Sequence, residues 1–296
     1  MNEKRATTWR LKTRTLEFGK LPALMGIVNV TPDSFSDGGS FFDHKKAVAH
    51  GLQLAADGAA ILDVGGESTR PNADAVSETE ELRRVVHVVR DLAEETDVPV
   101  SIDTSKAKVA EEAIAAGAQI INDVTGLEGD VGMVEVATST EAGVCAMHMR
   151  GNPRTMQNEQ HLQYGNVVED ILEYLRARQE ALLSAGIASE RICLDPGIGF
   201  AKTHQHNLTL LANMNTYHQL GSPLLVGHSN KGFLAKILGD KSLDRTQATV
   251  GVSLSLATMG VQVIRVHKVR AVREAMISFA AAGGIDGQEF QLEAKK

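Results

Sequence analysis

Short apolar runs alternate along this chain with longer stretches whose apolar residues recur at helical spacing. Continuous apolar runs rich in β-branched residues are typical of strands buried on both faces. Runs of this kind occupy residues 23–28, 60–64, 98–102, 119–121, 143–147, 191–194, 223–226 and 261–266. Alanine-rich stretches between them predict helices, among them residues 46–57, 80–95, 109–116, 167–185 and 246–260. Strand and helix are therefore expected to alternate throughout.

This alternation indicates a parallel sheet whose two faces are both covered by helices. Eight such units in 296 residues predict a single-domain α/β fold, a closed (β/α)8 TIM barrel. A doubly wound open sheet is the alternative architecture. We expect the barrel to span residues 21–284, with an N-terminal extension at residues 1–20 and a C-terminal tail at residues 285–296.

A polar residue lies near the end of each apolar run or shortly after it. In a barrel the carboxyl ends of all strands lie on one face, where the active site is found. A single such residue is more often a helix cap or a turn residue, but eight together favour a shared site. In chain order they are Asn29, Asp63, Asp103, Asn122 with Asp123, His148, Asp195, Ser229 with Lys231, and Arg265 with His267.

These residue types suit a substrate with two chemically different parts. Asp103, Asn122 and Asp195 can accept hydrogen bonds from the N–H and amino groups of an amidine-like heterocycle. The basic residues after the last two strands suit a phosphate or a diphosphate. No group of histidine, cysteine and carboxylate residues has the spacing of a structural zinc or calcium site.

Two long polar loops follow the first two strands. Residues 29–39 read NVTPDSFSDGG and residues 63–71 read DVGGESTRP, in which Thr69 and Arg70 offer polar contacts to a substrate. Ordinary surface connections are the alternative for both. Residues 227–231, GHSNK, begin like a nucleophile elbow but end in Lys231 instead of glycine. Residues 197–202, GIGFAK, lack the third glycine of a dinucleotide fingerprint and place Phe200 in a loop.

Composition limits the possible partners. The formal charge of −7 and an aromatic content of 4% argue against nucleic acid, although a local cationic pocket for a small anion remains compatible. No segment has the eighteen or so uninterrupted apolar residues of a membrane span, and the first twenty do not read as a secretory signal. Cys145 and Cys193 lie in apolar runs and are interpreted as buried thiols of a reducing compartment. We expect a cytoplasmic protein.

Several segments together resemble one family, the dihydropteroate synthases of folate biosynthesis. Residues 25–39, MGIVNVTPDSFSDGG, and residues 63–71 are similar to its two signature segments. Further matches follow in the same order at residues 101–106, 121–123, 147–149, 194–197 and 265–267, so the resemblance covers roughly residues 22–283. It implies a transferase that uses Mg²⁺ and joins 6-hydroxymethyl-7,8-dihydropterin diphosphate to p-aminobenzoate, releasing diphosphate. It also implies a homodimer that contacts through the late helices.

The resemblance assigns a role to each candidate site residue. The pterin is expected to contact Asp63, Asp103, Asn122, Met147, Asp195 and Lys231. The diphosphate is expected to contact Asn29, Thr69, Arg265 and His267, with Asn29 also binding Mg²⁺. The p-aminobenzoate is expected to contact Pro32, Asp33, Arg70, Phe200 and Ser229. Catalysis is assigned to Asp103, Asp195 and Lys231, with carboxylates and cations at opposite ends of the cavity to stabilise a pterin cation and the leaving anion.

Two positions depart from the family pattern. This chain has Ser-Asn-Lys at residues 229–231 where Ser-Arg-Lys is usual, and Lys268 where aspartate usually follows the histidine. We interpret the loss of arginine at Asn230 and of the acidic residue at Lys268 as one compensated rearrangement that keeps activity. A paralogue that binds pterin without catalysis is the alternative. A pterin-binding methyltransferase and a Schiff-base aldolase using Lys231 are more distant possibilities.

Overall fold

The structure, a computed structural model, describes residues 5–31, 40–71 and 73–288. An antiparallel hairpin, β1 and β2, precedes a single sheet of eight parallel strands. The strands are β1 (Thr8–Arg10), β2 (Thr15–Glu17), β3 (Ala23–Asn29), β4 (Ile61–Gly65), β5 (Val100–Asp103), β6 (Ile120–Asp123), β7 (Gly143–Met147), β8 (Ile192–Asp195), β9 (Leu225–Val226) and β10 (Val263–Val266). The α-helices are α1 (Ser40–Ala56), α2 (Glu78–Glu95), α3 (Ala107–Ala115), α4 (Met133–Thr140), α5 (Val167–Ser184), α6 (His204–Ala212), α7 (Gly232–Leu238), α8 (Thr246–Thr258) and α9 (Val269–Ala281).

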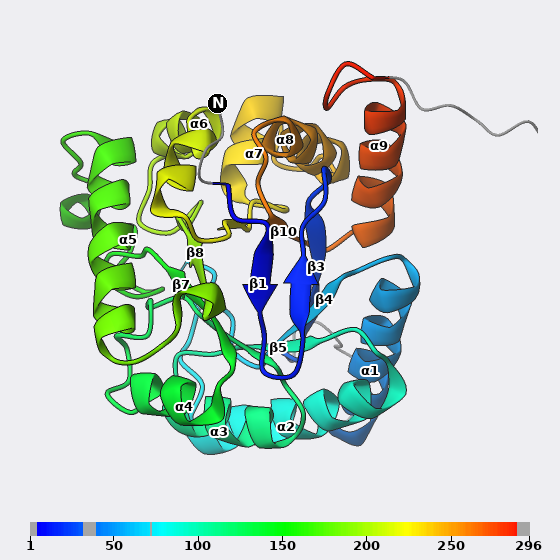
Figure 1. Ribbon diagram of the computed structural model, residues 1–296, viewed down its shortest axis with the longest axis vertical. Helices are drawn as coiled ribbons and strands as arrows, with labels where there is room; N and C mark the ends of the chain where they lie inside the picture. Colours follow the sequence, from blue (N-terminus) through cyan, green and yellow to red (C-terminus); the bar gives the residue numbers. More distant parts are fainter. Residues whose placement is uncertain (1–4, 32–39, 72, 289–296) are drawn as a thin grey trace, which may run out of the picture.

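The parallel sheet closes on itself. Its strand order is β8-β7-β6-β5-β4-β3-β10-β9, so that β8 and β9 stand at the two ends. A parallel bridge between Leu194 and Leu224 joins these ends, and the Leu194 amide donates to the carbonyl oxygen of Pro223 at 2.9 Å. The prediction of a (β/α)8 barrel is confirmed, and the doubly wound alternative is wrong. Figure 1 shows the helices arranged around the strands.

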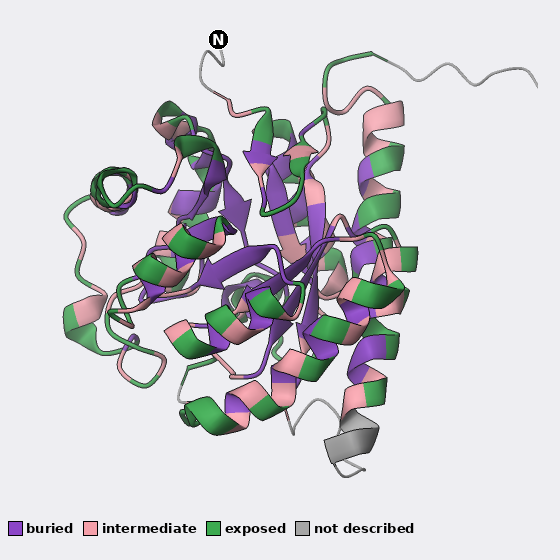
Figure 2. Cartoon of the chain, turned by 60° about the horizontal axis from the view of Figure 1, so that its bottom comes forward, coloured by how far each residue is buried: buried purple, intermediate pink, exposed green. Residues whose placement is uncertain are grey.

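The helices pack one apolar face against the barrel and expose the other. In α2 the buried side chains Val85, Val88, Val89 and Leu92 recur every three or four residues, which is the spacing of one helix face. Ser77 begins this helix because its hydroxyl accepts a hydrogen bond from the Glu80 amide at 3.3 Å. Each fully buried valine or leucine contributes about 1.5 kcal/mol or more to stability. Figure 2 shows the buried strands inside a ring of helices whose outer faces are exposed.

Inward-facing strand residues change from apolar to polar along the barrel. Side chains alternate between the two faces of a strand, so Ile61 and Asp63 of β4 both point into the barrel. On β10 the inward-facing residues are Val263 and then Arg265, and on β8 they are Cys193 and then Asp195. The amino-terminal half of the interior is therefore an apolar cluster, whereas the carboxyl-terminal half carries ionisable groups.

The N-terminal hairpin covers the apolar end of the barrel. Trp9 on β1 is fully buried and packs in one cluster with Met25, Ile61 and Val263 at the amino ends of their strands. Its indole N–H donates to the carbonyl oxygen of Arg191 at 2.9 Å. Figure 1 shows β1 at the centre of the view, inside the ring of helices. The hairpin that precedes the first barrel strand thus contributes to the core.

Among the described residues, no helix combines the length and the apolar character that crossing a bilayer would require.

Candidate active site

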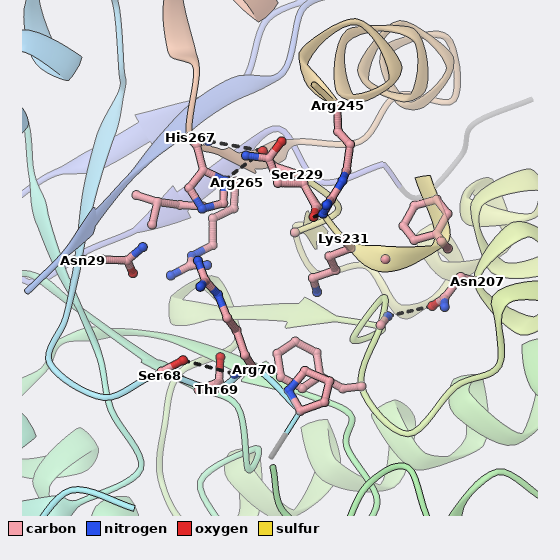
Figure 3. A pocket seen from close by; sticks show the side chains of 18 of the residues that line it. Asn29, Ser68, Thr69, Arg70, Asn207, Ser229, Lys231, Arg245, Arg265 and His267 are labelled. Carbon is pink, nitrogen blue, oxygen red and sulfur yellow. Dashed lines mark hydrogen bonds between the residues drawn. The ribbon is translucent and has the colours of Figure 1, made fainter. Parts of the chain in front are cut away.

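A cavity of about 1020 Å³ opens at the carboxyl end of the barrel strands. Its volume is at the upper end of the range typical of small-molecule sites. Figure 3 shows side chains from several strands and loops pointing into it. The residues singled out from the sequence that line it are Asn29, Thr69, Arg70, Asp103, Phe200, Ser229, Lys231, Arg265 and His267.

Arg265 lies between two carboxylates at the base of this cavity. Its Nε donates to Asp63 Oδ2 at 2.5 Å and its Nη2 donates to Asp103 Oδ2 at 2.7 Å. Asp63 also accepts from Asn122 Nδ2 at 3.1 Å, so four strands contribute to one network. Although burial opposes the charged form, the two carboxylates raise the pKa of Arg265. Burial raises the pKa of Asp103 to about 7, and the charge of Arg265 offsets part of that rise.

This network contradicts our expectation that carboxylates and cations occupy opposite ends of the cavity. Arg265 was expected to stand apart from the carboxylates, yet it contacts both Asp63 and Asp103. The reason is the strand order, in which β10 pairs with β3 and β3 pairs with β4. The long side chain of Arg265 on β10 therefore extends past β3 to the carboxylates on β4 and β5. With both carboxylates ionised, the three groups carry one net negative charge. This negative charge favours the binding of an electron-poor ring next to the three groups.

Lys231 lines the cavity, and Asp195 is buried below the lining. Asp195 Oδ1 accepts a hydrogen bond from the Gly197 amide at 2.7 Å, which fixes the orientation of the carboxylate. Gly197 has a φ of 71°, and a Cβ there would lie 2.0 Å from the carbonyl oxygen of His148, so only glycine fits. Lys231 Nζ donates to the carbonyl oxygen of Ile198.

Lys231 also lies over an aromatic ring. Its Nζ is 4.3 Å from the centroid of the Phe200 ring, a cation–π distance. Burial lowers the pKa of Lys231 to about 7 and raises that of Asp195. Near neutral pH this amine can therefore hold or release its proton as the charge in the cavity changes.

Ser229 and His267 meet at the mouth. The Ser229 hydroxyl is 2.9 Å from His267 Nδ1, and the His267 amide donates to that hydroxyl at 3.3 Å. Burial, followed by the charge of Arg265, lowers the pKa of His267 to about 4. The imidazole is thus neutral at physiological pH and acts as a hydrogen-bonding group.

The loop after β4 is anchored by a group of ionisable residues that the sequence did not single out. Lys106 pairs with Glu67, which lines the cavity, and with the fully buried Glu81 at 2.5 Å. Glu67 Oε1 also accepts from the Val76 amide at 3.2 Å. These contacts fix the segment that carries Thr69 and Arg70. Figure 3 shows Arg70 extending from this loop toward Arg265.

Lys202 is a second lysine at the cavity and, unlike the half-buried Lys231, it is buried. Its Nζ donates to the carbonyl oxygen of Phe200 at 2.8 Å and lies 3.0 Å from His148 Nδ1. Burial lowers the pKa of Lys202 well below its ordinary value. Its place in the GIGFAK segment was the available signal, but a lysine two residues after a loop aromatic gives no sign of burial. Lys202 supports the loop on which Phe200 is presented.

Arg245 and Asn207 are further lining residues that sequence reasoning missed. Arg245 Nη1 donates to the carbonyl oxygen of Asn230 at 2.6 Å, and Asn207 Oδ1 accepts from the Gly199 amide at 2.6 Å. Both come from helix starts remote from the strand ends. Neither residue belongs to a motif identified in the sequence analysis above.

The remaining predicted residues occupy three different situations. Asn122, Asp195 and Met147 are buried below the cavity lining, and Met147 packs in an apolar cluster with Phe200. Asp63 is fully buried and is connected to the cavity through Arg265. Pro32 and Asp33 lie outside the described residues.

The two positions that depart from the family pattern are not joined by a direct polar interaction in the described part of the chain. Among the hydrogen bonds and ion pairs of the described chain, none joins Asn230 to Lys268. The charge of Lys268 helps to lower the pKa of Asp244, after hydrogen bonds from Thr246. Because Arg245 follows Asp244 and bonds Asn230, an indirect connection runs through this pair.

A magnesium ion fits the residues at one side of the cavity. Within the described ranges, no three histidine, cysteine or carboxylate side chains are grouped so that they could hold a metal. Mg²⁺ bound with a phosphate substrate, however, needs only one or two protein oxygens. The Asn29 side chain points into the cavity in Figure 3 and has no hydrogen-bond partner in the described structure. Its amide oxygen is such a ligand.

Comparison with known proteins places the chain in a family. Residues 25–267 match the family model described as pterin binding enzyme. The dihydropteroate synthase of Haemophilus influenzae is 45% identical over 255 residues, which cover 86% of this chain and 91% of that protein. The chain belongs to the dihydropteroate synthase family.

Solved structures of this family share the barrel. The Xanthomonas albilineans dihydropteroate synthase with 4-aminobenzoic acid has a TM-score of 0.86 and 39% identity, covering 95% of this chain and 99% of that one. The same enzyme in complex with 7,8-dihydropteroate has a TM-score of 0.84 and 38% identity, covering 94% and 99%. The family resemblance inferred from the motifs is confirmed.

Proposed function

We infer that this protein is a dihydropteroate synthase, a transferase that joins 6-hydroxymethyl-7,8-dihydropterin diphosphate to p-aminobenzoate and releases diphosphate. The observation that carries this conclusion is the hydrogen-bonded network of Asp63, Asp103, Asn122 and Arg265, which comes from four strands and meets the cavity at Asp103 and Arg265. The Xanthomonas albilineans relative binds 4-aminobenzoic acid, a substrate of this reaction, and 7,8-dihydropteroate, its product.

The pterin is held by groups that match its edge. Carboxylates accept hydrogen bonds from the ring N–H and amino groups, a role we assign to Asp103 and Asp195. Asn122 both donates and accepts, and Lys231 donates to the ring carbonyl. These groups lie on strands or on loops tied to strands, so the ring is positioned before the chemistry begins.

Charge governs the reaction once the substrates are in place. Loss of diphosphate leaves positive charge on the pterin methylene, which the carboxylates around Arg265 stabilise because together they are net negative. Thr69, His267 and the outward N–H groups of Arg265 receive the leaving anion. When bound at Asn29, Mg²⁺ offsets the negative charge of the diphosphate. The aniline nitrogen then attacks the methylene carbon, so that a C–N bond replaces the broken C–O bond, and the proton released from the nitrogen passes to water.

An alternative function, pterin binding without catalysis, is favoured by the departures at Asn230 and Lys268. One assay separates the two. Purified protein is mixed with the pterin diphosphate, p-aminobenzoate and Mg²⁺, and diphosphate release is followed with and without the aminobenzoate. Release that depends on p-aminobenzoate, together with 7,8-dihydropteroate found by mass spectrometry, supports the synthase. Pterin binding in calorimetry without release would refute it and support the paralogue.

The requirement for Mg²⁺ is tested in the same assay. Chelation of divalent cations is expected to abolish diphosphate release, and added Mg²⁺ to restore it. An Asn29→Ala variant should need a higher Mg²⁺ concentration for half-maximal activity, because it lacks the amide ligand. Equal Mg²⁺ dependence of the variant and the unaltered protein would refute this role for Asn29.

We also propose a homodimer in the cytoplasm. Ile237, Leu238 and Leu243, on and after α7, are exposed apolar side chains, and Ile277 on α9 is another. The free thiols of Cys145 and Cys193 are consistent with a reducing compartment. Light scattering coupled to size-exclusion chromatography is expected to give twice the chain mass of 31.7 kDa. A monomeric mass would refute the dimer.

A further inference from the structure

Arg245 places a guanidinium at the cavity that the mechanism above does not use. It is the N-cap residue of α8, and it lines the cavity together with Ser229 and Lys231. Its Nη1 donates to the carbonyl oxygen of Asn230 at 2.6 Å. Figure 3 shows the side chain pointing from α8 into the cavity on the side of Lys231.

The local backbone holds this arginine in place. Asn230 has a φ of 59°, a left-handed conformation that asparagine adopts more readily than most residues. Its amide donates to the Thr249 hydroxyl at 3.3 Å, so Asn230 is bonded twice to the beginning of α8. The guanidinium is therefore positioned before any ligand arrives.

The charge of Arg245 has no carboxylate partner in the described part of the chain. The neighbouring Asp244 instead accepts hydrogen bonds from the Thr246 amide at 3.0 Å and hydroxyl at 2.9 Å. Arg265, by contrast, already contacts two carboxylates. Arg245 is thus a lining cation available to an anionic ligand.

The position of Arg245 indicates which anion it meets. Figure 3 places it on the opposite side of the cavity from Asn29, where the diphosphate and its cation are expected. It stands instead near Ser229 and Lys231, on the side assigned to the aminobenzoate. A guanidinium can form two parallel hydrogen bonds with a carboxylate.

We propose that Arg245 binds the carboxylate of p-aminobenzoate and makes the site select anilines with an anionic para substituent. This rests on the proposed function. It makes Arg245 a substrate-binding residue whose contribution depends on the charge of the second substrate and not on the pterin.

The test compares Arg245→Gln with the unaltered enzyme on two second substrates. For p-aminobenzoate, KM is expected to rise about tenfold or more, the loss of one charge-assisted hydrogen bond. KM for the pterin diphosphate should stay within about twofold. With p-aminobenzamide, which has no negative charge, the variant and the unaltered enzyme should have equal KM. Arg245→Lys, which keeps the charge, should recover part of the affinity for p-aminobenzoate.

Arg176→Gln is the matched control, because Arg176 is an exposed arginine on α5 whose one hydrogen bond among the described residues is to Gln219, at 3.3 Å. Arg176→Gln should leave KM unchanged for both p-aminobenzoate and the pterin diphosphate. A larger effect of Arg245→Gln on the pterin diphosphate would overturn the proposal and assign Arg245 to the diphosphate. A rise in KM for p-aminobenzamide equal to the rise for p-aminobenzoate would also overturn the proposal, since the effect would then not depend on the charge of the second substrate.

Binding of p-aminobenzoate is measured by calorimetry as well, on protein preloaded with pterin and diphosphate. Weaker binding to Arg245→Gln supports the role of Arg245 even if the protein shows no turnover, a result that would refute only the proposed function. Unchanged binding overturns the role of Arg245 whether or not the protein is active.

Discussion

Replacing Arg265 with methionine tests the charged network at the base of the cavity. The side chain of Asp63 is 0% exposed and that of Asp103 is 11% exposed, and both contact the same guanidinium. Methionine has a similar length but no charge. The variant therefore leaves two neighbouring buried carboxylates without their cation.

The expected cost is large. Removing one partner of a buried ion pair typically destabilises a protein by about 3–5 kcal/mol, because a charge remains buried without compensation. The loss should depend on pH. Burial already raises the pKa of Asp103 to about 7, and without Arg265 it rises further. When a carboxyl group has a higher pKa in the folded state than in the unfolded state, the free energy of unfolding decreases with increasing pH. The decrease runs from about pH 4, the pKa of the unfolded state, to the pKa of the folded state. The penalty should therefore be larger at pH 8 than at pH 5.

Urea unfolding measures this directly. The chain contains a single tryptophan, Trp9, which is fully buried beneath the barrel, so its fluorescence reports loss of the core. Arg176→Met is the control and should change the free energy of unfolding by less than about 0.5 kcal/mol. The double variant Arg265→Met, Asp103→Asn should recover part of the loss, because one of the two uncompensated charges is gone.

An unfolding free energy of Arg265→Met equal to that of the unaltered protein at pH 8 would refute this reasoning. So would a penalty that grows as the pH is lowered, because protonation of the carboxyl groups must relieve it.

Three further results are expected. Asp103→Ala should weaken pterin binding in calorimetry, and Lys231→Ala should lower turnover at least about tenfold, or about 1.4 kcal/mol; unaltered values in both would mean that the site is elsewhere. Because burial lowers the pKa of Lys231 to about 7, kcat/KM for the pterin diphosphate should fall as pH rises above that value, when the amine loses its proton; a flat profile up to pH 9 would contradict this role. Trp9→Ala should destabilise the barrel by about 3–5 kcal/mol in thermal or urea unfolding, and a loss below 1 kcal/mol would contradict the place of the hairpin in the core.

The strands were predictable because their signal is local. The run at residues 143–147 coincides with β7, and the run at residues 223–226 contains the shorter β9, Leu225–Val226. The hairpin of β1 and β2 gave no comparable signal, because its strands are three residues long and lie among charged residues. Trp9, Leu11 and Phe18 join the hairpin segment to the core, but they are separated along the chain and form no apolar run.

The site was predictable to the extent that it lies at strand ends. Asp103, Lys231 and Arg265 were expected at one rim because parallel strands in a barrel share a direction, and all three line the cavity. Lys202 and Arg245 were missed because they belong to a loop and a helix start. Their role depends on burial and on neighbours that are distant along the chain.

The order of apolar and polar residues by itself determined the barrel and the face on which its ionisable groups lie, because both follow from strand periodicity and direction. Pairing between those groups was decided only by the tertiary structure. Arg265 contacts Asp63 and Asp103 because closure of the sheet sets how far a side chain on one strand reaches across the interior, and no local pattern contains that distance.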